Sequence, residues 1–275
     1  MPELPEVETI VLDLAPRVTG CQITHPHLYR TDVLREIRKA PLLRALDGNR
    51  IADVYRRAKH VVLRLGDGRR VVIQPRMTGS LVVHQRRLTR DQRRYAVLEL
   101  PFREGGRLVF RDVRRLGTIW LLDEAAWAVY TARIGPEPLD PDFGVASFAA
   151  RLRDTRQAIK RALMDQRRLA GVGNIYANEA LFMARIDPSR SANTLDRAEL
   201  RALHTSIRRV LRAAVTARGT TVRDYRTGTG QRGAFQHVLR VYGRGGEPCA
   251  TCGTPLATTH AIDGRATTFC WRCQR

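Results

Sequence analysis

The sequence predicts an α+β protein of several domains, with an N-terminal β-sandwich, a flanking helix, a helical C-terminal domain and a cysteine-rich β-hairpin. Three observations support this prediction. Short β-branched segments fill the first half of the chain, helical patterns follow a proline-rich boundary, and four of the five cysteines lie in the last 27 residues. At 275 residues and 43% hydrophobic content, the chain can fill such cores.

A helix is expected at the N-terminus, ending at Gly20. Its apolar stripe is Val7, Ile10, Val11, Leu14 and Val18. Pro5 suits the first helical turn, and the carboxylate of Glu6 complements the positive end of the helix dipole. Pro2 and Glu3 precede the helix, and neither is expected to satisfy its exposed amides. Their presence requires another reason.

The β-sandwich is expected from short segments that alternate with turn residues. They span residues 60–65, 69–74, 80–84, 95–100, 107–110 and 118–122. Strands at such close intervals favour a sandwich or a flattened barrel, against which the first helix would pack. This pattern predicts one domain over residues 1–132.

A linker is expected over residues 133–144, which hold three prolines and two glycines. A helical domain over residues 145–243 should follow. Its clearest helix runs from Asp196 to Ala217, with one apolar stripe and arginines off that stripe that face solvent or a polyanion. The remaining residues, 244–275, form the cysteine-rich module.

Paired cysteines predict a metal site in that module. The ligands are Cys249, Cys252, Cys270 and Cys273, in two CxxC pairs. Such spacing matches one tetrahedral Zn²⁺ with four thiolates, and with no ligand position open the ion should be structural. Disulfides are the alternative, which a cytoplasmic chain disfavours. A turn signal at Asp263-Gly264 places Arg265 beside the tip of the hairpin.

Charge identifies the expected partner. Lysine and arginine number 48 against 27 acidic residues, giving a net charge of +21, so nucleic acid is the default partner. Arginine bias accounts for part of the excess, because only Lys39, Lys59 and Lys160 are lysine. The chain shows no membrane span and no secretory signal, and we expect a cytoplasmic, nucleoid-associated monomer.

A glycine-flanked turn, Gly171-Val172-Gly173, leads into the helical pattern of residues 174–182. Exposed amides at such a helix start favour a phosphate, and Asn174 would stand at the cap position. An ordinary turn between two helices explains the same residues equally well.

The motifs together resemble, in order and over essentially the whole chain, formamidopyrimidine-DNA glycosylase of the Fpg/Nei family. They are "PELPEVET", "RRAKH", "RMTGSL", "RDVRRLG", "GPEPL", "VGNIYANEALF", "VYGRGGEPC" and "RATTFCWRC". The related endonuclease VIII group usually has a glycine where Leu4 stands here, so the resemblance favours the formamidopyrimidine branch. It implies a catalytic N-terminal domain and a helix-two-turn-helix motif in the helical domain.

The resemblance implies a DNA glycosylase and abasic-site lyase that excises 8-oxoguanine and formamidopyrimidines. With Met1 removed, Pro2 becomes a secondary amine, and the α-amino group has an intrinsic pKa of about 7.7–8.0. Its attack on C1′ of the damaged nucleotide would expel the base and leave an iminium for strand cleavage. Glu3 would shuttle protons, Lys59 would serve β-elimination and Arg265 the subsequent δ-elimination, while Glu6 would orient the terminus.

Other positions match residues that the family uses to hold damaged double-stranded DNA. The backbone contacts are Arg93, Arg115, Arg156, Lys160, Asn174 and Tyr242. The residues that fill the gap left by the extruded nucleotide are Met77, Arg114 and Leu116.

Several positions depart from the family pattern. Leu116 replaces the usual phenylalanine wedge, and Gln74 and Arg93 stand at or near expected histidines. The loop of residues 226–235, which in the family folds over the flipped base, is also individual. These departures leave two alternatives: the same chemistry on oxidised pyrimidines, and a zinc-finger protein that binds damaged DNA without cutting it. The lesion ranking, the opposite-base preference and the processing of Met1 are not fixed by the sequence.

Overall fold

The structure is a computed structural model that describes residues 2–221 and 227–275. The described chain forms two compact units. Unit 1 contains the residues up to Ala132 together with the segment Ala217–Ala234, and unit 2 contains Arg133–Thr216 and Phe235–Arg275. Within the segment Ala217–Ala234, the described residues 217–221 and 227–234 are therefore grouped with the N-terminal residues.

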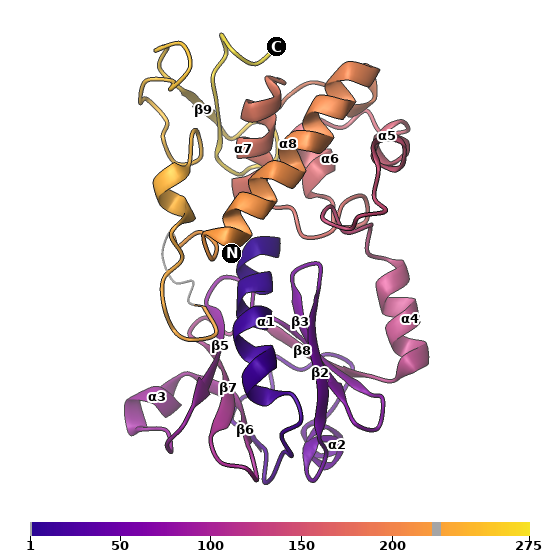
Figure 1. The fold of residues 1–275 in the computed structure, drawn as a ribbon, viewed down its shortest axis with the longest axis vertical. Helices are drawn as coiled ribbons and strands as arrows, with labels where there is room; N and C mark the ends of the chain where they lie inside the picture. Colours follow the sequence, from indigo (N-terminus) through magenta and orange to yellow (C-terminus); the bar gives the residue numbers. More distant parts are fainter. Residues whose placement is uncertain (1, 222–226) are drawn as a thin grey trace. The chain divides into compact units, whose positions relative to one another are not determined.

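Two four-stranded antiparallel sheets make up most of unit 1 (Figure 1). One has the strand order β1-β6-β7-β5 and the other the order β2-β3-β4-β8. The first contains β1 (His27–Leu28), β5 (Gly79–His84), β6 (Ala96–Pro101) and β7 (Arg107–Asp112); the second contains β2 (Ile51–Arg57), β3 (His60–Leu65), β4 (Arg70–Gln74) and β8 (Thr118–Leu122). The predicted N-terminal β-sandwich is confirmed.

Helix α1 (Leu4–Val18) contacts β2 of one sheet and β5 of the other. Leu4, Val7, Ile10 and Leu14 are fully buried, and the last three belong to one apolar core with residues from both sheets. The helical spacing of these side chains is the reason the helix seals the sandwich. The flanking helix expected from the sequence is thus confirmed, starting at Leu4.

Three shorter helices complete unit 1: α2 (Lys39–Leu46), α3 (Arg90–Arg94) and α4 (Glu124–Ala132). Helix α4 covers the second sheet through an aromatic cluster that includes Trp120, Trp127 and Tyr130. The hydroxyl of Tyr130 lies 2.9 Å from Nε2 of His60, next to Lys59. Burial raises the pKa of Tyr130 to about 12.

Unit 2 is built around two helices that contact each other, α7 (Asn174–Ala184) and α8 (Arg197–Thr216). Helix α5 (Val145–Leu152) contacts α8, and α6 (Ile159–Met164) contacts α7. Two 3-10 turns, Ala192–Thr194 and Phe235–Val238, flank α8. The 20-residue α8 corresponds closely to the helix expected from Asp196 to Ala217.

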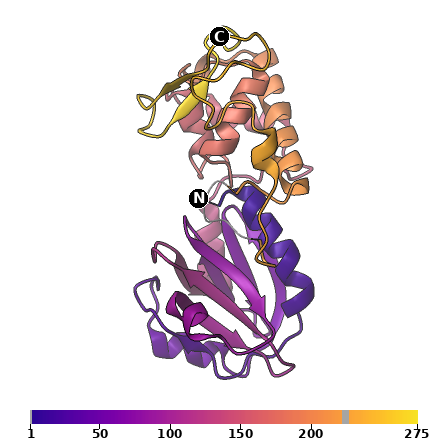
Figure 2. The same cartoon turned by 90° about the vertical axis from the view of Figure 1, so that its left-hand side faces the viewer.

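The C-terminal hairpin pairs β9 (Ala257–Thr259) with β10 (Thr267–Phe269), and β10 contacts α7 (Figure 2). Beneath it, Phe182 of α7, Val241 and Leu256 form a small core with the cysteines. The hairpin is therefore fixed to the helical layer of unit 2 by packing.

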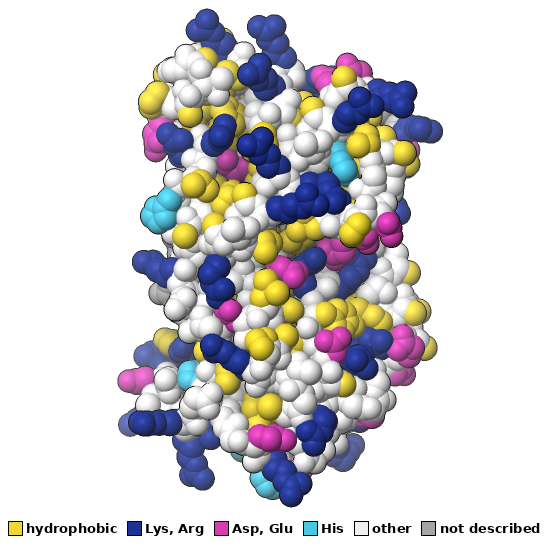
Figure 3. All heavy atoms as spheres, in the orientation of Figure 1, with side chains coloured by type: hydrophobic (Ala, Val, Ile, Leu, Met, Phe, Trp, Pro, Cys, Tyr) yellow, Lys and Arg dark blue, Asp and Glu magenta, His cyan; other side chains and the backbone are white. Residues whose placement is uncertain are grey.

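Basic side chains are scattered over the face shown in Figure 3 rather than gathered in one patch. Among the described residues, no helix combines the length and apolar character needed to cross a bilayer.

Candidate functional site

The N-terminus is held by a carboxylate in the first turn of α1. Glu3 is the N-cap and forms a capping box with Glu6, whose Oε2 accepts the amide of Glu3 at 2.8 Å. Oε1 of Glu6 accepts the amide of Thr220 at 2.7 Å. The expectation that Glu3 satisfies no helix amide was therefore wrong. Pro2 and Glu3 are buried, and the peptide between them is fixed from one side by Glu6.

Lys59 lies in the two-residue turn between β2 and β3, where Arg57 pairs with His60. It is buried, at 5% exposure, and Ala58 before it has a positive φ of 52°. Arg56 ties this turn to α1, because its Nε binds Glu8 at 2.6 Å and its Nη1 donates to the Ala58 carbonyl at 3.1 Å. The turn carrying Lys59 and helix α1 are thus joined by a partly buried ion pair.

Met77, Arg114 and Leu116 lie on two neighbouring loops, residues 75–78 and 113–117, which we call the wedge loops. Buried Asp112 joins them: it accepts the Thr78 hydroxyl and, at 2.7 Å, the amide of Gly117. Thr78 also accepts the amide of Arg114 at 3.0 Å. Met77 and Leu116 remain 45% and 42% exposed. The structure therefore brings the three void-filling candidates together.

Gly117 is required at the base of the second wedge loop. A Cβ there would lie 2.7 Å from Cζ of Phe110 and 3.0 Å from Oδ2 of Asp112. Any side chain would separate Asp112 from the amide that it accepts.

Arg93 and Arg115 line different pockets of unit 1, so the structure does not bring them together. Arg115 forms an ion pair with Asp32 at 3.1 Å and borders a pocket of about 400 Å³ with Arg30 and Arg94. Arg93 borders a pocket of about 500 Å³ that also contains Glu99. Burial acts to raise the pKa of Glu99, but hydrogen bonds from Tyr29 and Arg107 outweigh it, so the pKa is lowered.

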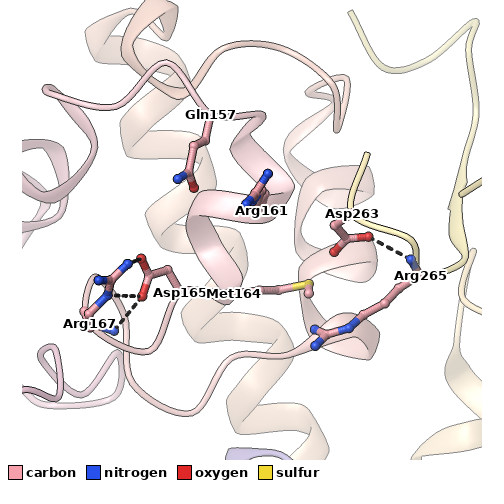
Figure 4. A pocket seen from close by; sticks show the side chains of 7 residues that line it. All are labelled: Gln157, Arg161, Met164, Asp165, Arg167, Asp263 and Arg265. Atoms are coloured by element: carbon pink, nitrogen blue, oxygen red, sulfur yellow. Dashed lines mark hydrogen bonds and ion pairs between the residues drawn. The ribbon is translucent and has the colours of Figure 1, made fainter. Parts of the chain in front are cut away.

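The largest group of site candidates in unit 2 surrounds the finger tip, defined here as residues 260–266. Beside it is a pocket of about 460 Å³ (Figure 4). Its lining residues are Gln157, Arg161, Met164, Asp165, Arg167, Asp263 and Arg265. The Arg167 hydrogen bonds hold the pKa of Asp165 below its usual range. Arg161 and exposed Arg265 leave the pocket suited to an anion.

Asn174 is the first residue of α7 and not its cap, because Gly173 occupies the cap position. Its Nδ2 donates to the carbonyl of Ala266 at 3.1 Å, so the side chain contacts the finger tip. Lys160 is 0% exposed and its Nζ is directed at the same hairpin. Both side chains thus contact the finger within the protein, and the contacts with the DNA backbone expected of them stay predictions. Arg156 is exposed.

Tyr242 is positioned by Glu179, a residue that the sequence patterns did not single out. Buried Glu179 on α7 accepts three consecutive amides, those of Arg240, Val241 and Tyr242, at 2.8–2.9 Å. The single carboxylate within the mostly apolar helix sequence "NIYANEALF" is the signal that could have identified it. Asp112, between two strands and the wedge motif, carried no comparable signal.

The four cysteines of the C-terminal module converge. Their Sγ atoms all lie within 4.8 Å of one another, with 4.0 Å between Cys249 and Cys273 and 3.5 Å between Cys252 and Cys270. These separations are too long for disulfides. A tetrahedral site with Zn–S bonds of about 2.3 Å has sulfur atoms about 3.8 Å apart, so the donor set fits Zn²⁺.

Together these features define a class of nucleic-acid enzyme: a β-sandwich that encloses its own N-terminus, and a helical unit with a four-cysteine finger. Family models agree with that class. The formamidopyrimidine-DNA glycosylase N-terminal domain matches residues 1–119, and the formamidopyrimidine-DNA glycosylase H2TH domain matches residues 134–226.

Relatives match over full length. The formamidopyrimidine-DNA glycosylases of Thermomicrobium roseum and Heliobacterium modesticaldum are 44% and 42% identical, covering 100% of this chain and 99% and 100% of theirs. Lactococcus lactis Fpg bound to abasic-site DNA covers 99% of both chains at 33% identity and a TM-score of 0.91. A variant of it bound to Fapy-dG DNA covers 100% of both, at 33% identity and a TM-score of 0.92. The chain belongs to the formamidopyrimidine-DNA glycosylase family.

Proposed function

We propose that the protein excises oxidised purines from duplex DNA and cleaves the strand at the resulting abasic site, with Pro2 as nucleophile. The main observation in support is the way in which the N-terminus is held. Pro2 is buried just before α1, and the carboxylate of Glu6 accepts the backbone amide of Glu3, which follows Pro2. A binding protein has no need for this arrangement. Solved relatives bound to Fapy-dG, abasic-site and 8-oxoguanine DNA support the substrate class.

After removal of Met1, the Pro2 nitrogen attacks C1′ of the damaged nucleotide and the bond from C1′ to the base breaks. Opening of the sugar ring gives a C1′ iminium, which carries a positive charge because the amine is secondary. Loss of the C2′ proton then breaks the C3′–O3′ bond, which is β-elimination. Loss of the C4′ proton breaks the C5′–O5′ bond, which is δ-elimination. Water hydrolyses the iminium and restores Pro2.

Glu3 is the proposed proton shuttle, because it is adjacent to Pro2 and is held at the same helix start. Lys59 is the proposed proton donor in β-elimination. Its turn is fastened to α1 through Arg56 and Glu8, which keeps it at the helix end that carries the nucleophile. Arg265, exposed at the finger tip, is assigned to δ-elimination.

The remaining candidates are assigned to DNA binding. Arg93, Arg115, Arg156 and Tyr242 contact the backbone, and the wedge loops fill the gap left by the extruded nucleotide. The four cysteines would hold one Zn²⁺, which supplies folding energy to the finger and no chemistry.

Borohydride trapping tests the proposal, because it reduces an iminium to a stable amine. We expect tag-free protein to be trapped on a duplex with one 8-oxoguanine opposite cytosine and on an abasic-site duplex, with the adduct mapping to Pro2. Pro2→Gly should retain affinity for an uncleavable abasic analogue while strand cleavage falls by about 100-fold or more.

Each alternative predicts another pattern. An adduct on the abasic duplex alone, with excision of an oxidised pyrimidine, would assign the same chemistry to the endonuclease VIII substrate class. Tight binding with no adduct on any duplex would establish a non-catalytic protein. Cleavage by Pro2→Gly at the wild-type rate would exclude Pro2 as nucleophile.

A further inference from the structure

Lys160 is a fully buried cation on α6 whose ammonium contacts the finger. Its Nζ donates to Oγ1 of Thr267 at 2.7 Å and lies 3.4 Å from Oδ1 of Asp263. Burial of an ammonium is costly unless it is paired and hydrogen-bonded. These contacts meet that requirement with two residues that flank Arg265.

Both acceptors also hold the backbone of Arg265. Oδ1 of Asp263 accepts the amide of Arg265 at 3.1 Å, and the Thr267 hydroxyl donates to the Arg265 carbonyl at 3.4 Å. The hydroxyl can do so because it accepts its other hydrogen bond from Lys160. The two peptide groups of Arg265 are thus connected, through one intermediate each, to the same ammonium.

Figure 4 shows the Asp263 carboxylate turned to the Arg265 amide, while the Arg265 side chain extends across the pocket past Met164. Gly264, between them, has a positive φ of 76°, which makes the turn tight enough for this contact. The direction in which Arg265 leaves the finger tip is therefore set by the turn that Lys160 holds.

The rest of the hairpin has supports that do not involve Lys160. Asn174 donates to the Ala266 carbonyl, and Oδ1 of Asn178 accepts the amide of Thr268 at 3.0 Å. The cysteine cluster supplies a further attachment. Loss of the Lys160 contacts should consequently disturb Arg265 while the hairpin as a whole stays in place.

We propose that Lys160 is a positioning residue, whose buried ammonium aims Arg265 through Asp263 and Thr267 and so sets the efficiency of δ-elimination relative to β-elimination. This inference rests on the proposed function of Arg265. It assigns Lys160 an indirect role in place of a phosphate contact.

The test uses Thr267→Val, which removes the hydroxyl at nearly constant shape, because Lys160→Met also empties a buried cationic site. Thr267→Ser, which keeps the hydroxyl, is the matched control. Arg272→Met removes an exposed charge from the same finger without touching the network. Each full-length, zinc-loaded variant is assayed on an abasic-site duplex for the β and the δ product, with base release and zinc content measured in parallel.

We expect Thr267→Val to lower the δ to β product ratio about tenfold, the size of a lost hydrogen bond to a charged group, with zinc content and base release unchanged. Thr267→Ser and Arg272→Met should keep the wild-type ratio. In an Arg265→Ala background, Thr267→Val should add nothing, because both substitutions act on the same step.

A wild-type ratio in Thr267→Val would overturn the inference. So would an equal fall in base release, β-elimination and δ-elimination, because that pattern describes a general structural role. Absence of strand cleavage by the wild-type protein would instead count against the proposed function, which keeps the two failures distinct.

Discussion

At the residue scale, one buried side chain, Asp112, positions both wedge loops. Asp112, fully enclosed, connects both loops through Thr78 and the amide of Gly117, so the exposed ends of Met77 and Leu116 project from a fixed base. Leucine at 116 can separate a base step but offers no aromatic face for stacking. Affinity for a lesion should therefore be open to improvement at this one position.

Leu116→Phe is expected to strengthen binding to a duplex with an uncleavable abasic analogue by about tenfold, because stacking on an aromatic ring is worth about 1–3 kcal/mol per base. The measurement is the dissociation constant at fixed salt. Val113→Phe is the matched control, since Val113 is 55% exposed on the same loop. Equal gains in both variants would reflect added apolar surface, and no gain in Leu116→Phe would exclude the wedge role.

At the scale of elements, α8 begins with a carboxylate that serves two purposes. Glu199 and Asp196 each accept the other's backbone amide, at 2.9 and 2.8 Å, in the pattern of a capping box. Glu199 also forms an ion pair with Arg190, from the loop that precedes the helix. The hydrogen bond from Arg190 is the main cause of a lowered pKa for Glu199.

Glu199→Gln keeps a capping acceptor and removes the charge. Because the folded pKa lies below the ordinary value of 4.5, the ion pair stabilises the fold above that pH and its contribution is lost as pH falls through the folded pKa. We expect the variant to unfold about 2–4 °C below wild type at pH 7, a difference of about 1 kcal/mol, and we expect this difference to shrink as pH falls below 4.5. Thermal melts at pH 7 and at acidic pH measure this.

Glu247→Gln provides the control, because Glu247 pairs with Arg244 at a side-chain exposure of 53%. Its melting temperature should hardly change at pH 7. A gap for Glu199→Gln that does not shrink at acidic pH would mean that capping, and not the ion pair, stabilises α8.

At the scale of the whole molecule, two features bear on DNA binding: the net charge and the cysteine cluster. The net charge of +21 supports a general attraction to duplex DNA that weakens as salt rises, because the counterions released from DNA then gain less entropy. The finger needs an internal support because its core contains only Phe182, Val241, Leu256 and cysteines. A metal held by four thiolates would replace the apolar burial that so small a module lacks.

Cys249→Ala is therefore expected to abolish stoichiometric zinc binding and to weaken affinity for damaged duplex by at least about tenfold. Metal analysis of the purified protein and a binding isotherm measure the two effects. Cys21→Ala, which removes a partly buried thiol of unit 1, should change neither. Full zinc content in Cys249→Ala would refute the four-thiolate site.

The sequence predicted those parts that depend on local pattern. Alternating β-branched residues indicated the sandwich, helical spacing indicated α1 and α8, and CxxC spacing indicated the cysteine cluster. It could not place Lys160, because the burial of its ammonium depends on the packing of a hairpin whose Thr267 lies 107 residues later in the chain. Asn174 was misplaced by one position because Gly173, with its extended backbone, serves as the cap.

The sequence pattern also did not predict that the described residues of Ala217–Ala234 belong to unit 1. Two acids on one face of α1 hold this segment: Glu6 accepts the Thr220 amide, and Asp13 accepts both Arg218, at 2.6 Å, and the Thr229 amide, at 3.3 Å. Gly228 packs so closely on Asp13 that an added Cβ would lie 2.6 Å from the Asp13 Cβ. The sequence pattern assigned Glu6 to the start of the helix and singled out no partner for Asp13. Residue 226, the first of the loop expected to fold over the base, lies outside the described residues.

The hydrogen bonds that Glu6 and Asp13 accept join residues more than 200 positions apart in the chain. These bonds can therefore form only late in biosynthesis. Helix α1 leaves the ribosome first, yet its two acids meet their partners only after most of the chain has been translated. The sandwich can condense earlier, but the segment that completes it arrives after the helices of unit 2. The contacts that hold the start of α1 are thus completed late, so a prematurely terminated chain would lack the hydrogen bond between Thr220 and Glu6.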